Sequence, residues 1–162
     1  MRDPAARLTI QTVVDQTRRA TGATTAWLLA GTVGGLTVVA ASGPVGPPDG
    51  TMVEITGSRA YALSSGQAVA LVPQAGDPTS AGLGGSDGVP VSVLLVPVLL
   101  APVSPAIDAT AGAVALLEAA GKEGARPFTL DDISRVGLLA PIAAAALAEQ
   151  LDPRHRAPAP AD

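Results

Sequence analysis

The sequence predicts an α+β domain in which helices at the two ends of the chain pack on one face of an antiparallel sheet of five to six strands. Apolar residues recur at helical spacing near both ends, and short strands rich in Val and Leu lie between them. Of the 162 residues, 48% are hydrophobic, which is enough to bury a core. We expect one domain over residues 1–151 and a disordered, Pro- and Ala-rich tail over residues 152–162.

The first helix is expected over residues 4–20. Asp3 is suited to cap its N-terminus, and Pro4 fits the first helical position. Apolar residues over 10–17 recur at helical spacing, and Gly22 suits the position that ends a helix.

The middle of the chain predicts short strands. A β-hairpin is expected from strands 24–30 and 36–42, because the glycines between them tolerate the backbone of a tight turn. A loop over 43–50, a short helix over 58–64 ended by Gly66, a strand over 68–72 and a long loop over 73–88 follow.

Two apolar strands, 91–100 and 111–119, lack polar alternation and are expected in the interior of the sheet. The stretch 88–107 is long enough to cross a bilayer, but its four prolines favour strands over a membrane helix.

A turn over 121–127 is expected to precede the last helix. Thr129 is a suitable N-cap for it, and Asp131 and Asp132 complement the positive end of the helix dipole. Pro141 lies inside this helical pattern, and we expect it to kink or split the helix.

Composition excludes several functions. The net charge is −4 and the ten basic residues are scattered, so neither nucleic acid nor a membrane surface is an expected partner. The absence of Cys excludes disulfides, thiolate zinc sites and Cys nucleophiles. The single histidine, His155, lies in the predicted tail, so we expect no metal and no cofactor. Nothing at the N-terminus has the apolar core of a secretion signal, and we expect a cytoplasmic protein.

Several segments, in this order, resemble the GAF family of sensory domains. They are residues 21–29, 36–43, 65–69, 95–98, 112–117 and 128–132, spread over about residues 5–151. The absence of Asn and the abundance of Ala, Gly and Pro suggest codon usage of a high-GC bacterium.

The resemblance implies a small-molecule pocket on the sheet face away from the terminal helices, beneath the short helix and the long loop. Trp27, Arg59, Tyr61, Gln74 and Asp77 would line it by this resemblance. Trp and Tyr each combine apolar area with a hydrogen-bond donor. A core-filling role for Trp27 and a solvated position for Arg59 are the competing interpretations.

Known branches of the family fit this sequence poorly. The branch that reduces free methionine sulfoxide and the branch that attaches bilins both use cysteine, and haem requires an axial ligand. The cyclic-nucleotide branch is echoed only in part by Lys122, Phe128, Asp131 and Asp132, since the expected Asn is replaced by Gly121 and the spacing is shorter. With no nucleophile–base pair in the predicted domain, we expect no enzyme activity.

Two functions remain open. The first is a sensory or regulatory domain that binds a small molecule and signals through a helical homodimer interface formed by residues 4–20 and 129–151. The second is a ligand-free dimerisation or docking module for a signalling or transcription-regulatory protein partner. In both cases the alanine-rich last helix is apolar around much of its circumference, which favours burial against a second chain.

Overall fold

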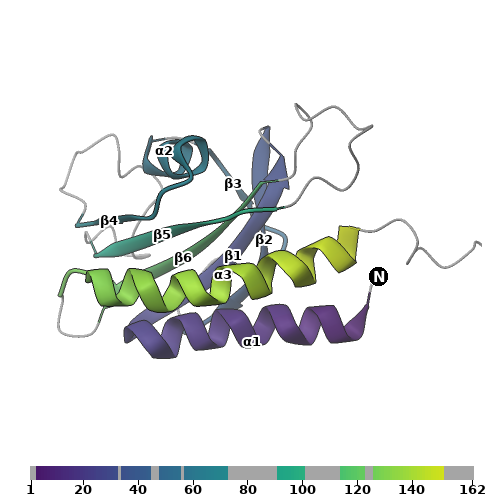
Figure 1. Cartoon of the computed structure of the whole chain (residues 1–162), viewed down its shortest axis with the longest axis horizontal. Coiled ribbons are helices and arrows are strands. Elements are labelled where there is room, and N and C mark those ends of the chain that lie inside the picture. Colours follow the sequence, from purple (N-terminus) through teal and green to yellow (C-terminus); the bar gives the residue numbers. More distant parts are fainter. Residues whose placement is uncertain are drawn as a thin grey trace, which may run out of the picture.

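The computed structural model describes residues 3–32, 34–44, 48–55, 57–72, 91–100, 114–122 and 126–151. Its elements, labelled in Figure 1, are α1 (Pro4–Thr21), β1 (Ala23–Thr32), β2 (Gly35–Ser42), β3 (Met52–Val53), α2 (Gly57–Ser65), β4 (Val69–Leu71), β5 (Val93–Val98), β6 (Val114–Lys122) and α3 (Leu130–Leu151).

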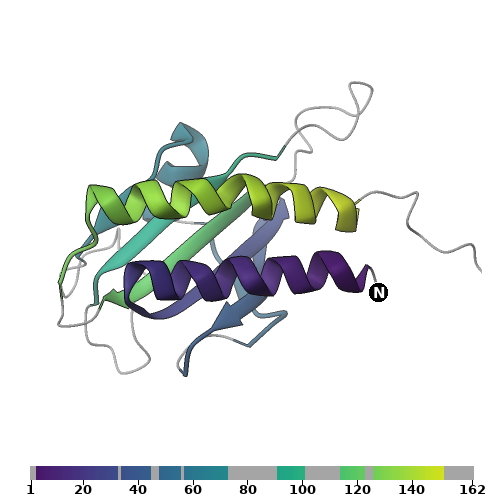
Figure 2. The same ribbon diagram turned by 60° about the horizontal axis from the view of Figure 1, so that its bottom comes forward.

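The strands form one six-stranded sheet in the order β3-β2-β1-β6-β5-β4, and every neighbouring pair is antiparallel. Helices α1 and α3 lie side by side on one side of the sheet, which we call the helix face (Figures 1 and 2). Helix α2 covers part of the opposite side, which we call the α2 face. The predicted α+β arrangement is therefore confirmed.

The ends of the predicted helices follow the expected local chemistry. The Asp3 carboxylate accepts a hydrogen bond from the Ala5 backbone N–H at 3.0 Å, and Gly22 ends α1 in a left-handed conformation with φ of 67°. At the start of α3, the Thr129 hydroxyl accepts from the Asp132 N–H while the Asp132 carboxylate accepts from the Thr129 N–H. This reciprocal pair satisfies two backbone groups that a helix N-terminus otherwise leaves unbonded.

Two parts of the sequence-based prediction require correction. Strand β3 was missed, because two residues that pair only with Leu36 and Thr37 carry no apolar pattern of their own. The turn expected over 121–127 was placed too early, since β6 continues through Lys122, and residues 123–125 lie outside the described residues. Of the two outcomes expected at Pro141, a kink or a split, the structure has the kink: α3 is one helix whose second half is bent relative to the first (Figure 1). Proline has no backbone N–H to donate to the carbonyl four residues earlier, and the loss of this hydrogen bond lets a helix bend at that point.

The loop predicted over 73–88 and the connection over 102–110 lie outside the described residues, and so does the tail over 152–162. Among the helices that the structure describes, none has the length and apolarity needed to cross a bilayer.

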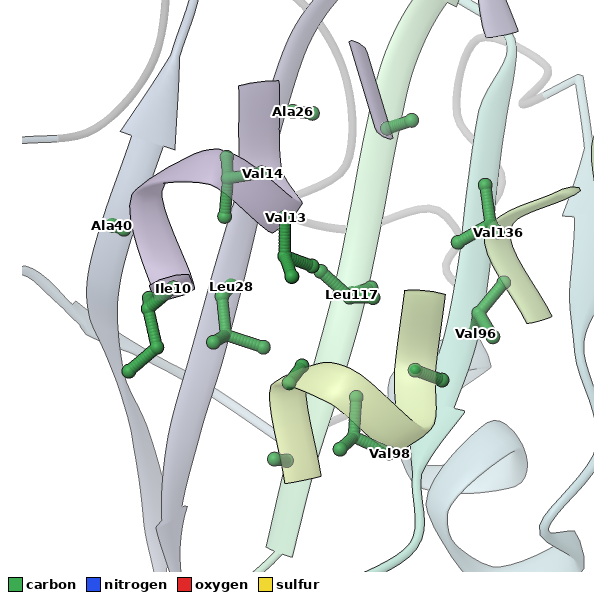
Figure 3. Close-up of a cluster of buried hydrophobic side chains, with 14 of the residues drawn as sticks. Ile10, Val13, Val14, Ala26, Leu28, Ala40, Val96, Val98, Leu117 and Val136 are labelled. Carbon is green, nitrogen blue, oxygen red and sulfur yellow. The ribbon is translucent and has the colours of Figure 1, made fainter. Parts of the chain in front are cut away.

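Alternate residues of the central strands build two separate apolar layers. On the helix face, Leu28, Val96 and Leu117 pack against Val13 of α1 and Val136 of α3 (Figure 3). On the α2 face, the layer contains Trp27, Leu29, Leu36, Val38, Ala62, Val93, Leu95, Leu116 and Ala120. Successive strand residues point to opposite faces, so each of β1, β5 and β6 contributes to both layers. This confirms that the two uninterrupted apolar strands lie inside the sheet.

Candidate functional site

A single charged residue interrupts the apolar layer of the α2 face. Glu118 lies on β6, one of the two strands at the centre of the sheet order, and is fully buried. Its flanking residues on the same strand face, Leu116 and Ala120, are buried, and so is its partner Leu95 across the β5–β6 pair. A carboxylate removed from water in this way needs hydrogen bonds or a counter-charge.

Trp27 supplies the first hydrogen bond. It stands directly opposite Glu118 across the β1–β6 pair, and its indole N–H donates to the Glu118 Oε2 atom. Directly opposed residues on one sheet face have Cβ atoms about 5 Å apart, so the strand register alone brings the two side chains together.

Arg59 supplies the counter-charge from above the sheet. It lies on α2, its side chain is only 4% exposed, and its Nε donates to Glu118 Oε1 at 2.6 Å. The Arg59 Nη2 atom donates to Glu118 Oε2 at 3.2 Å. The guanidinium therefore meets the carboxylate through two N–H groups, the fork geometry in which arginine binds carboxylates most strongly.

Trp27, Arg59 and Glu118, which we call the charged cluster, join three elements that are far apart in sequence. Removing one partner of a buried ion pair costs about 3–5 kcal/mol, because the other charge stays buried. Within the described ranges, no buried side-chain nitrogen or oxygen lacks a hydrogen-bond partner. The cluster is thus internally satisfied in this conformation.

The structure separates the five predicted site residues. Trp27 and Arg59 meet through Glu118, so both are buried on the face where the resemblance placed a pocket. Tyr61 is on α2 but 56% exposed. Gln74 and Asp77 lie outside the described residues. Whether any of the five contacts a ligand stays a prediction.

Glu118 was missed by the sequence analysis, which treated strand 111–119 as uniformly apolar. The signal was present, since a lone acidic residue inside Ala115-Leu116-Leu117-Glu118-Ala119-Ala120 has to be paired if the strand is buried on both faces. The sequence alone did not show that Arg59 is its partner, because the pairing depends on how α2 packs on the sheet.

A second polar group joins the end of β6 to the start of α3. Lys122 forms an ion pair with Asp132, and its ammonium lies 5.9 Å from the centre of the Phe128 ring. Burial alone would raise the pKa of Asp132, but hydrogen bonds from Lys122 and Thr129 hold that pKa below its ordinary value. Three residues of the partial cyclic-nucleotide pattern thus come together as the N-terminal support of α3, while Asp131 is exposed and pairs with Arg135.

The outward surface of α3 is the third notable feature. Between residues 137 and 148 no exposed residue of this helix is polar. The exposed set, which we call the apolar surface of α3, consists of Gly137, Leu138, Pro141, Ile142, Ala145 and Ala148. Leu138 is 76% and Ile142 47% exposed. On α1, which runs antiparallel to α3 in Figure 2, Leu8 is 69% exposed.

Within the described part of the chain, no three His, Asp or Glu side chains come together in a way that would hold a metal ion.

Comparison with known proteins identifies the fold. No protein-family model matches the sequence, and no curated protein matches it. Among solved structures, the chain is similar to the GAF-B domain of DevS from Mycobacterium smegmatis, with 24% identity, a TM-score of 0.60, and coverage of 89% of this chain and 92% of that one. It is also similar to the GAF domain of a two-component sensor histidine kinase from Bacillus halodurans (13% identity, TM-score 0.59, coverage 90% and 94%). The chain therefore has the GAF-domain fold.

One similar structure corrects the prediction that the chain is not an enzyme. A type II free methionine-R-sulfoxide reductase from Thermoplasma acidophilum has the same fold, with 16% identity, a TM-score of 0.66, and coverage of 90% of this chain and 94% of that one. The expectation rested on the absence of cysteine and of a nucleophile–base pair, but catalytic and sensory proteins share this architecture. The prediction that this chain is not an enzyme is therefore contradicted.

Proposed function

We propose that this chain is a sensory or regulatory domain that binds a small molecule on the α2 face and passes the event to a second copy through α1 and α3. The observation that carries the proposal is the charged cluster. A buried carboxylate, guanidinium and indole converge beneath a short helix, on the sheet face that the terminal helices leave uncovered. A few convergent polar groups in apolar surroundings are characteristic of small-molecule sites.

The connection to the helices runs through the sheet itself. Leu117 and Glu118 are adjacent on β6, and their side chains belong to opposite layers. A ligand that moved Glu118 or its strand would act on the packing of Leu117 against the helix face, because packed cores transmit small shifts. The similarity to a GAF domain of a sensor histidine kinase is consistent with this role.

A second copy is the proposed partner of the helices. The apolar surface of α3 is unusual for an exposed helix, and its glycine, proline and alanine residues permit close approach of another helix. Light scattering at high micromolar protein concentration tests this part. We expect the mass of two chains, and the mass of one chain would refute the dimer.

A ligand-free dimerisation or docking module is the second candidate. It is favoured by the complete pairing of the charged cluster, in which Arg59 already neutralises Glu118. In this case α2 would be a fixed part of the fold, and only the helix face would bind a partner.

A thermal-shift screen separates the two candidates. A ligand at a hundred times its dissociation constant stabilises the native state by about 2.7 kcal/mol. For a chain of this size, that corresponds to a rise of roughly 5–10 °C in Tm. A screen of nucleotides, amino acids and amines that yields such a rise supports the sensory domain, and a screen without response favours the docking module.

A further inference from the structure

We propose that Glu118 is the acceptor for a small organic cation of the guanidinium type, and that Arg59 occupies the position of that cation in this structure. The inference rests on the proposed small-molecule function and adds the chemical class of the ligand. It is carried by the different placement of the two charges in the cluster, one in the sheet and one on the short helix.

Glu118 belongs to the rigid part of the molecule. Its strand, β6, is hydrogen-bonded on one side to β1 and on the other to β5, and the Trp27 indole fixes the carboxylate further. Its neighbours Leu95 and Leu116 are fully buried. The carboxylate therefore has a fixed position in an apolar floor.

Arg59 lies outside the sheet, on the short helix α2. Helix α2 has nine residues, and only Arg59 and Ala62 among them are buried. A helix this short is not stable by itself and depends on its tertiary contacts. The Arg59 pair with Glu118 is one of the contacts that attach α2 to the sheet.

Separation of the pair has unequal consequences for the two groups. Arg59 would move with α2 toward water, where a guanidinium is readily hydrated, whereas Glu118 would stay in the apolar floor with its charge exposed to hydrocarbon. A buried carboxylate without a counter-charge is strongly unfavourable. A ligand that takes the place of Arg59 must therefore bring a positive charge, and an anion would find no counter-charge in the floor.

The hydrogen bonds define the shape of that cation. Trp27 donates to Oε2 only, while Arg59 donates one N–H to each carboxylate oxygen. Trp27 leaves both carboxylate oxygens able to accept one more hydrogen bond from the side of α2. A planar guanidinium has two parallel N–H donors that fit these two oxygens. An ammonium group supplies the charge without the second aligned donor, so it should bind less tightly.

Chemical rescue tests the proposal in the full chain. Arg59→Ala removes the resident guanidinium, and methylguanidinium is then added at low millimolar concentration against matched sodium chloride. Trp27 is the only tryptophan of the chain, so its emission reports on the cluster. We expect a Tm about 10 °C below wild type, from the cost of a broken buried pair. Methylguanidinium should raise this Tm and change the Trp27 emission in a saturable manner, and methylammonium should do so with lower affinity.

Three controls define the outcomes. The Arg59→Ala, Glu118→Gln double variant should give no saturable response. Arg135→Ala, which removes an exposed arginine on α3 and keeps the charged cluster, should respond as wild type does. Acetate is the anionic probe, and it should leave Arg59→Ala and wild type unchanged. If Arg59→Ala fails to fold, Arg59→Gln keeps a hydrogen-bonding side chain at the position and takes its place.

The proposal is overturned if methylguanidinium rescues neither Arg59 variant, or if the Glu118→Gln double variant responds equally. A saturable response of wild type to acetate would overturn it too, because Arg59 would then be the recognition group for an anion. That result would leave the small-molecule function standing. The general function fails separately, when no compound of any charge stabilises the wild-type chain.

Discussion

The two faces of the sheet are filled in different ways. The helix face is covered by α1 and α3, and its layer is almost wholly aliphatic, with Val, Leu, Ile and Ala in contact along both helices (Figure 3). The α2 face is covered over part of its extent by a nine-residue helix, and a charged pair lies in the middle of its layer. Aliphatic packing holds the domain together, whereas the charged cluster carries a desolvation cost and is the site of the proposed binding.

The largest expected effect comes from breaking the charged cluster. Arg59→Met leaves the Glu118 carboxylate buried without its counter-charge and should lower the free energy of unfolding by about 3–5 kcal/mol. The measurement is urea unfolding at neutral pH. Arg59→Met combined with Glu118→Leu should recover most of the loss, because an apolar pair of similar volume often replaces a buried ion pair without penalty. If the double variant is no more stable than the single one, the pair is not the source of the effect.

Substitutions of two adjacent leucines on β6 allow a direct comparison of the two faces of the sheet. Leu116 and Leu117 are both fully buried, one in each layer, so either change to Ala should cost about 2–5 kcal/mol. Only Leu116→Ala should alter the emission of Trp27, which lies in the same layer. Fluorescence spectra of the two folded variants check this, and an equal change in both would mean that the faces are not independently packed.

Lower pH should weaken the start of α3. Because the pKa of Asp132 lies below its ordinary value of 3.8 in the folded chain, its contribution is fully present above that value and is lost as pH falls toward the folded pKa. Asp132→Asn should cost about 1–2 kcal/mol at neutral pH through the lost helix cap and ion pair. It should also flatten the fall in stability below about pH 4. Urea unfolding from pH 2.5 to 7 tests both effects.

Asp131→Asn is the matched control, because its carboxylate is exposed and pairs only with the exposed Arg135 in the described chain. This substitution should change the free energy of unfolding by no more than about 0.5 kcal/mol. An Asp132→Asn variant with the wild-type pH profile would contradict the role assigned to Asp132.

The smallest effect on the fold is expected from the apolar surface of α3. Ile142→Glu should change the unfolding free energy of the single chain by no more than about 0.5 kcal/mol, as is usual for surface changes. It should nevertheless lower the mass measured by light scattering from two chains to one, because a charge would be buried at the proposed interface. Met52→Glu alters another exposed apolar residue, on β3, and should leave the mass unchanged. Loss of the dimer in both variants would remove α3 as its specific site.

The elements that the sequence predicted well carry strong local signals. Asp3 with Pro4, Thr129 with Asp132, and the apolar periodicity of both long helices act over a few residues. The uninterrupted strands β5 and β6 are recognisable for the same reason. Strand β3 depends instead on pairing with Leu36 and Thr37, and no local sequence pattern predicts that contact.

The candidate site was predictable only in part. Trp27 and Arg59 were singled out through a family resemblance, but the group that joins them was not. Which residues oppose Glu118 depends on the register of β1 against β6, about ninety positions apart in sequence. The acidic residue Glu118 could be seen in the sequence of an apolar strand. Its partners could be identified only from the folded structure.

The central claim is that the charged cluster of the α2 face binds a small molecule. The most direct measurement is a titration of the wild-type chain with agmatine, a small guanidinium compound, with Trp27 emission and Tm followed together. The account predicts a saturable change in emission and a parallel rise in Tm, weakened by competition from Arg59 and absent from the Arg59→Met, Glu118→Leu variant. An unchanged emission and Tm up to millimolar concentration, or an equal response of that double variant, would contradict it.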